Sequence, residues 1–127
     1  MTPAAELLFS MYYDQRISCL EIKVKEARNL PVGDSYVKAY LLPDRTKMTK
    51  RKSRVKRSNG QPIFNELLSY HLPVDRLLGR ALQLSAWQTD RLSRNLLIGQ
   101  VTLPLTPQTM AGCELRWYPL QPKVGYV

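Results

Sequence analysis

Apolar and polar residues alternate with a period of two along most of this chain. Leu20, Ile22 and Val24 alternate with charged residues, and the same pattern recurs over 36–41, 82–87 and 98–105. A period of two places successive side chains on opposite faces of a strand, so each segment is predicted to be a half-buried β-strand. The sequence contains no long run with the 3.6-residue period of a helix.

Turn-forming residues separate the predicted strands. Proline, glycine, asparagine and aspartate gather at 31–34, 43–44, 58–62 and 104–107, and these residue types favour turns. The segment 73–79 has room for one short helical turn. About eight strands with regular turns are typical of an all-β, antiparallel β-sandwich, which is the predicted fold.

Length and composition fit a single domain with its own core. The chain has 127 residues, of which 44% are hydrophobic, enough to fold as one unit. We expect the domain to cover residues 6–123, with residues 1–5 as leader or vector-derived residues. The sequence shows neither a signal peptide nor an apolar run near 18 residues, so any membrane contact is expected to be peripheral.

Positive charge is concentrated in one segment. The net charge is +9, and eight basic residues without an acidic one lie between Arg45 and Arg57. Elsewhere, basic and acidic residues nearly balance. One basic segment on a nearly neutral domain predicts an anionic partner that docks in one place.

The centre of this segment, 50–56, is predicted to form a strand. Alternation would place Lys50, Lys52, Arg54 and Lys56 on one face, with their charges about 7 Å apart. The alternative is a solvated edge strand whose lysines prevent aggregation.

Two aromatic residues are predicted to lie beside this charge. By alternation, Tyr36 is expected on the same strand face as Lys38 and Tyr40, and Trp87 on the same face as Ser85. Both faces lie opposite to the core-facing residues. Outward aromatic rings beside basic residues suit a flat or ring-shaped anion, either an inositol phosphate head group or a nucleic acid.

Few residues suggest metal binding or catalysis. Cys19 and Cys113 lack metal-site spacing, and Cys19 is predicted to be a buried free thiol, which fits a cytosolic setting. His71 is the only histidine and is expected to be structural or exposed. No catalytic set of residues stands out, so neither enzymatic activity nor a cofactor is expected.

Six segments in order along the chain resemble a C2 domain of the synaptotagmin kind, particularly that of the synaptotagmin-like proteins. They are "EARNLP" (26–31), "DSYVKAYLLPD" (34–44), "KRKSRVKR" (50–57), "QPIFNE" (61–66), "LQLSAWQTDR" (82–91) and "NLLIGQVTLPL" (95–105), with "RWYPLQPK" (116–123) closing the match. The resemblance implies an eight-stranded sandwich of type I topology with membrane-facing loops at one end.

The resemblance also implies a cellular role. Synaptotagmin-like proteins are tandem-C2 Rab effectors that tether secretory vesicles to the plasma membrane. We therefore expect a cytoplasmic, peripheral location on the plasma membrane or on secretory vesicles, and a role in exocytosis. A Rab GTPase would bind other parts of the parent protein.

The calcium site of the family is expected to be degenerate here. Many C2 domains hold calcium with about five aspartates, but the matching positions retain only Asp34 and Asp90. Gln88 and Leu96 stand at two of the others. Calcium prefers six to eight oxygen ligands, so we expect neither a metal site nor calcium dependence.

The phosphatidylinositol bisphosphate site of the family is retained in residue type. The resemblance assigns lipid binding to Tyr36, Lys38, Lys50, Lys52, Trp87 and Asn95, and Arg54 and Lys56 are expected to extend the basic row. The expected function is calcium-independent binding of anionic phospholipids. Binding of acidic proteins through the basic strand is the alternative, and the resemblance does not favour nucleic acid.

Overall fold

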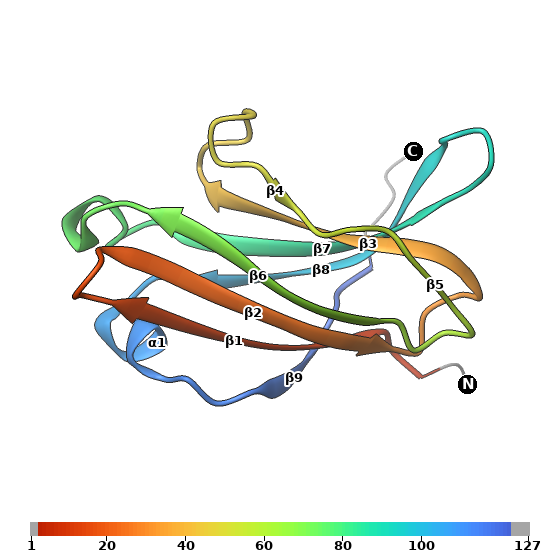
Figure 1. Cartoon of the computed structure of the whole chain (residues 1–127), viewed down its shortest axis with the longest axis horizontal. Helices are drawn as coiled ribbons and strands as arrows, with labels where there is room; N and C mark the ends of the chain where they lie inside the picture. The colour runs from red at the N-terminus through yellow and green to blue at the C-terminus, as the bar shows by residue number, and fades with distance from the viewer. Residues whose placement is uncertain (1–2, 123–127) are drawn as a thin grey trace.

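The computed structural model describes residues 3–122, which form two antiparallel β-sheets packed face to face (Figure 1). The first sheet has the order β6 (Ile63–His71), β2 (Cys19–Arg28), β1 (Glu6–Asp14) and β9 (Arg116–Pro119). The second has the order β4 (Arg51–Lys52), β3 (Gly33–Leu42), β7 (Ala81–Thr89) and β8 (Asn95–Pro104), and β5 (Lys56–Ser58) also pairs with β3. Since β4 and β5 share one edge of β3, they take the place of one strand, and the predicted eight-stranded β-sandwich is confirmed.

The core lies between the sheets, on the faces that the alternation predicts. The apolar residues of three predicted strands are at most 1% exposed: Leu20, Ile22, Val24, Val37, Ala39, Leu41, Leu82, Leu84 and Ala86. All of them belong to one hydrophobic cluster. Burial of this apolar area is the main force that holds the two sheets together.

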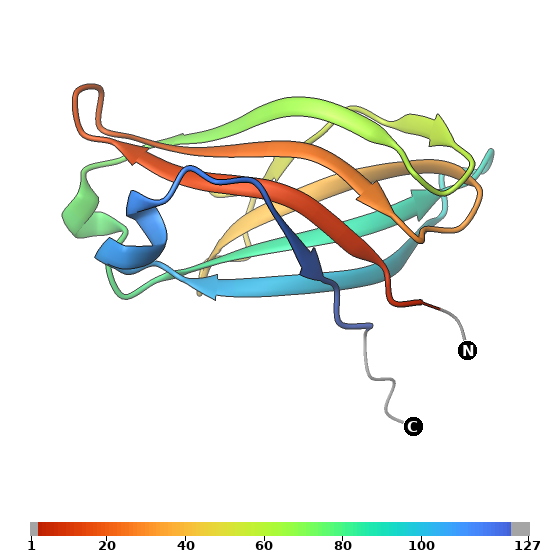
Figure 2. The ribbon, with the colours of Figure 1, turned by 90° about the horizontal axis from the view of Figure 1, so that it is seen from below.

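Two short helical segments lie at one end of the sandwich (Figure 2). The 3-10 helix η1 (Val74–Arg76) falls within the predicted helical turn. The helix α1 (Pro107–Ala111) was not predicted. Thr106 and Thr109 form a capping box at its start, with Pro107 in the first turn, so Thr-Pro-x-Thr is the local signal for this helix.

The first strand begins at residue 6, and Ala4 and Ala5 before it contact the domain. The carbonyl of Ala5 accepts a hydrogen bond from the Leu120 N–H, and that of Ala4 accepts one from the Asn29 side chain. Lys123, the predicted end of the domain, lies outside the described residues. Within residues 3–122, no helix has the length and apolar character needed to cross a membrane.

The basic segment is not one regular strand, and this corrects the prediction. Lys52 pairs with Lys38, but Lys56 pairs with Ser35, so the basic segment has one extra residue between the two pairs. An extra residue of this kind reverses the face on which the following side chains lie. Lys56 therefore shares the face of buried Ser35, on the opposite side from Lys52.

Side-chain hydrogen bonds account for this interruption. The Oγ of Ser53 accepts the Val37 N–H at 2.9 Å. A carboxylate oxygen of Glu66, in the other sheet, accepts the Arg54 N–H at 2.8 Å. The backbone thus leaves the β3 ladder at Arg54 without losing a hydrogen-bond partner.

Candidate functional site

The outer face of the second sheet carries a row of polar and aromatic side chains. On β3 these are every second residue, and their partners on β7 lie directly opposite: Asp34 with Thr89, Tyr36 with Trp87, Lys38 with Ser85, and Tyr40 with Gln83. The intervening apolar residues of both strands enter the core: Val37, Ala39, Leu41, Leu82, Leu84 and Ala86. We name the set Tyr36, Lys38, Lys50, Lys52 and Trp87 the cationic face.

The two aromatic rings form its floor. The rings of Tyr36 and Trp87 are nearly parallel, at 7°, with centroids 6.4 Å apart. The indole Nε1 of Trp87 donates to the Ser85 Oγ at 2.8 Å, which fixes the orientation of the ring. Tyr36 lies on the predicted outer face of the sheet but is only 2% exposed, because a lysine covers it.

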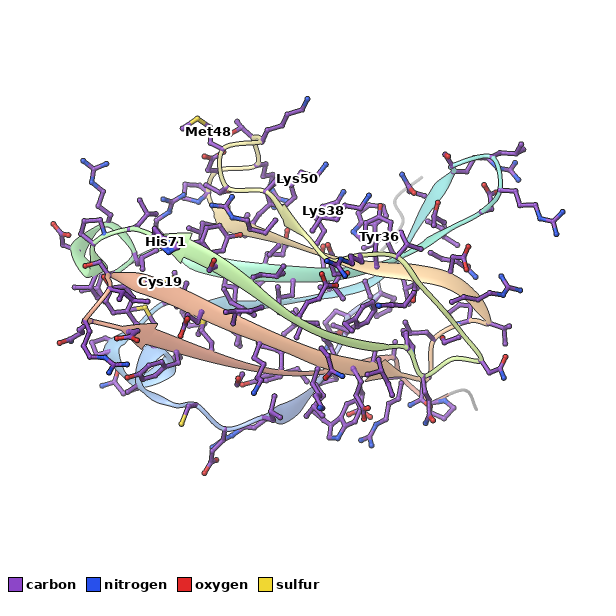
Figure 3. The ribbon with its side chains drawn as sticks, in the orientation of Figure 1. Cys19, Tyr36, Lys38, Met48, Lys50 and His71 are labelled. Carbon is purple, nitrogen blue, oxygen red and sulfur yellow. The ribbon has the colours of Figure 1, made fainter. Side chains whose placement is uncertain are left out.

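Two lysines lie over these rings. The Nζ of Lys52 is 4.2 Å from the centroid of Tyr36, and the Nζ of Lys38 is 4.3 Å from that of Trp87. Both are cation–π contacts, in which the negative face of the ring attracts the ammonium. They hold the ammonium groups at the sheet surface, and Figure 3 labels Tyr36, Lys38 and Lys50 along this region.

The lysines of the cationic face have no acidic partner. Burial lowers the pKa of Lys38, and the charges of Lys50 and Lys52 lower it further. Among the ion pairs of the described residues, none includes Lys38, Lys50 or Lys52. Three positive charges therefore lie close together without neutralisation, and they repel one another.

Arg45 is a neighbour of this face that the sequence reasoning missed. Its guanidinium donates to the Gln83 side-chain oxygen at 3.1 Å, and Gln83 in turn donates to the Thr102 hydroxyl. Gln83 has the same alternation as Ser85 and Trp87, so the sequence pattern places Gln83, the partner of Arg45, on the same face. Arg45 extends the positive surface beyond Lys38.

The remaining predicted site residues lie elsewhere. Asn95 is exposed and pairs with Thr89, two residues beyond Trp87 on β7. Arg54 is exposed where the chain leaves the ladder, and Lys56 occupies the opposite side of the sheet from Lys52. The structure thus brings together five of the eight predicted residues, with Asn95 at the margin.

The two aspartates of the degenerate calcium site are engaged by arginines. Asp34 forms an ion pair with Arg57 at 3.4 Å. Asp90 accepts the backbone N–H groups of Leu92 and Arg94, and its other oxygen is 2.7 Å from the Arg94 Nε. The hydrogen bond from the Arg94 N–H is the main reason why the pKa of Asp90 is lowered. Within the described range, His, Cys, Asp and Glu form no group of three or more able to hold a metal.

The cysteines and the histidine occupy ordinary positions. Cys19 is a buried free thiol, as predicted, and burial raises its pKa. Cys113 is free and exposed. His71 is exposed at the end of β6.

Comparison with known proteins identifies the family. A model of the C2 domain matches residues 18–120. Synaptotagmin-like protein 1 of Mus musculus is 42% identical over 93% of this chain and 21% of its own length, and synaptotagmin-like protein 2 of Mus musculus is 33% identical over 94% of this chain and 14% of its own length. The chain thus spans only a small part of these relatives.

A solved C2 domain of RIM from Drosophila superposes with a TM-score of 0.85 at 27% identity, covering 93% of this chain and 98% of that one. The sandwich, its strand pairing and these matches together show that the chain belongs to the C2 domain family, with synaptotagmin-like proteins among its relatives.

Proposed function

We propose that the cationic face binds the head group of phosphatidylinositol bisphosphate and docks the domain on anionic membranes without calcium. One observation carries the proposal. Two lysines without an acidic partner lie over two stacked aromatic rings on one face of the sheet, and the charge of a third, Lys50, acts on Lys38. A phosphorylated ring offers both the negative charge and the flat shape that this arrangement suits.

The energetics favour a membrane-bound ligand. Each lysine or arginine near an anionic surface contributes about 1 kcal/mol. Affinity for an anionic membrane would come from four such residues, Lys38, Lys50, Lys52 and Arg45. Salt weakens this affinity by screening their charges. Binding of phosphate groups would also offset the repulsion from Lys50 and Lys52, which adds to burial in lowering the pKa of Lys38.

Calcium is not expected to take part. A calcium ion prefers six to eight oxygen ligands, whereas the matching loops supply Asp34 and Asp90. Both carboxylates already contact arginines. Lipid composition, and not a calcium signal, would then control docking.

The family resemblance suggests where this docking takes place. We propose a peripheral location on the cytoplasmic face of the plasma membrane or of secretory vesicles, in exocytosis, with a Rab GTPase bound by other parts of the parent protein. The domain acts as a binding module and not as an enzyme. Its single histidine is exposed at a strand end, away from the cationic face.

Vesicle binding tests the proposal. The double substitution Lys50→Ala with Lys52→Ala should reduce binding to phosphatidylinositol bisphosphate vesicles by roughly tenfold or more, because it removes two of the contributing charges. The charge-matched control is Lys23→Ala with Lys25→Ala, on β2 of the other sheet, which should retain binding. Equal loss in both variants would show that net charge alone drives binding.

Competition separates the rival ligands. Soluble inositol trisphosphate should displace the domain from vesicles if the head group occupies the cationic face. An acidic protein partner as the principal ligand would instead show as poor vesicle binding that inositol phosphate does not affect. Equal affinity for DNA and for vesicles near physiological salt would indicate unspecific electrostatic binding.

A further inference from the structure

The loop between β3 and β4, residues 43–50, carries the most exposed large apolar side chain of the described residues. Met48 is 81% exposed, compared with 72% for Leu92, the next in order. The loop projects away from the sandwich in Figure 1, and Figure 3 shows Met48 at its tip with Lys50 nearer its base. Isolated exposed apolar side chains are common, so the surroundings of Met48 decide whether it has a role.

Hydrogen bonds within the loop hold Met48 outward. The carboxylate of Asp44 accepts the Thr46 N–H at 2.7 Å, and the Thr46 hydroxyl accepts the Met48 N–H at 3.2 Å. The Thr49 hydroxyl donates to the Asp44 carbonyl at 3.2 Å. The loop backbone therefore has a defined conformation, and presenting Met48 to a partner costs little backbone entropy.

Two residues fix the loop to β6 of the other sheet. The buried Tyr70 hydroxyl donates to the Thr49 carbonyl at 2.7 Å. The Arg51 guanidinium lies 4.4 Å from the Tyr70 ring centroid, and it donates to the carbonyls of Ser69 and Met48 at 2.9 and 3.4 Å. These contacts hold the loop in place relative to the sandwich, so its tip keeps a fixed position beside the cationic face.

The charge around the tip is positive. Arg45 and Lys47 are exposed, and Lys50 at the end of the loop belongs to the cationic face. The one acidic residue of the loop, Asp44, is engaged with Thr46. The loop and the cationic face thus form one positive surface from which an apolar side chain projects, a combination suited to the boundary between anionic head groups and acyl chains.

We propose that Met48 inserts into the head-group and acyl-chain boundary of an anionic bilayer while the cationic face holds phosphoinositide. The inference rests on the proposed function and adds to it a second, apolar contact on a different loop from the degenerate calcium site. With Met48 buried in the bilayer, the outer face of the β3–β7 sheet lies toward the membrane. The lysines supply the charge-dependent part of binding, and Met48 supplies a part that does not depend on charge.

Substitutions at Met48 test this contact. Met48→Ala should weaken binding to phosphatidylinositol bisphosphate vesicles by roughly three- to tenfold, as expected for partial burial of one apolar side chain. Met48→Trp should bind at least as tightly as the unaltered domain, because tryptophan favours the membrane interface. Both variants should bind soluble inositol trisphosphate with unchanged affinity. Ile17→Ala, in the turn between β1 and β2 where Ile17 is 56% exposed, is the matched control and should leave vesicle binding unchanged.

The salt dependence distinguishes the two contacts. The affinity ratio between the unaltered domain and Met48→Ala should stay constant as salt rises, whereas the ratio for Lys50→Ala with Lys52→Ala should shrink through screening. If Met48→Ala binds vesicles as well as the unaltered domain while the double lysine variant does not, this inference is overturned and the proposed function stands. If the unaltered domain does not bind phosphoinositide vesicles, both are overturned.

Discussion

At the scale of one residue, Lys38 shows how unpaired charge on the cationic face lowers the stability of the free domain. Its ammonium is partly buried over Trp87, with Lys50 and Lys52 close by. Burial and these charges lower its pKa, so the unfolded chain binds this proton more tightly than the folded domain does. The resulting loss of stability is present in full at neutral pH, and it is relieved as the pH rises above the lowered pKa toward the ordinary lysine value.

Neutralising one neighbour should therefore stabilise the free domain. Lys50→Gln is expected to raise the free energy of unfolding at neutral pH by about 0.5 kcal/mol, because surface charge changes have effects of this order. Urea denaturation at low salt measures the gain, and NMR titration should show a higher pKa for Lys38. The gain should shrink as salt screens the charges. A loss of stability at low salt would mean that repulsion among these lysines is not significant.

At the scale of elements, the edge of β3 is completed by side chains as well as by a partner strand. The hydroxyl of Thr49 accepts the Leu41 N–H at 3.2 Å, and that of Ser53 accepts the Val37 N–H at 2.9 Å. Both hydroxyl-bearing residues are buried. This arrangement allows the basic segment to follow β3 without a continuous ladder, and it keeps Lys52 on the outer face.

Ser53→Ala should destabilise the domain. The buried Val37 N–H would lose an acceptor, which costs about 1–3 kcal/mol. Chemical denaturation measures the change, and hydrogen exchange of the Val37 amide should become faster. Ser53→Thr keeps the hydroxyl and should lose less stability. Equal losses in the two variants would point to packing around residue 53 as the cause, in place of the hydrogen bond.

The basic segment also shows where alternation stops being informative. Period two predicted the core faces of β2, β3 and β7 because the pairing irregularities of β2 and β7 fall after their last predicted core residues, Val24 and Ala86. It was wrong for Lys56, since the extra residue between Lys52 and Lys56 changes the face without changing the local composition. Thr49 and Ser53, hydroxyl residues on either side of Arg51, were a usable signal for an irregular edge. The position of Arg45 depends on a long-range hydrogen bond to Gln83 that no local pattern encodes.

At the scale of the whole molecule, the degenerate calcium site and the cationic face differ in whether their charged groups are paired. At the loop end, Asp34 and Asp90 are paired with Arg57 and Arg94, so acidic groups are already neutralised internally. On the cationic face, lysines lack acidic partners. Within the described residues, the cationic face therefore carries unpaired positive charge, whereas the two aspartates at the loop end offer little free carboxylate to a cation.

Calcium is accordingly expected to leave membrane binding unchanged. Binding to phosphatidylinositol bisphosphate vesicles should be equal in about 1 mM calcium and in excess chelator, because two carboxylates provide too few of the six to eight oxygens that the ion prefers. Isothermal titration of the free domain should show no calcium binding at micromolar concentrations. Arg57→Ala with Arg94→Ala is the informative variant, since it frees both aspartates while leaving their number at two, and it should remain insensitive to calcium. Calcium-stimulated binding in that variant alone would mean that the arginines block a competent site, and stimulation in the unaltered domain would refute calcium-independent docking altogether.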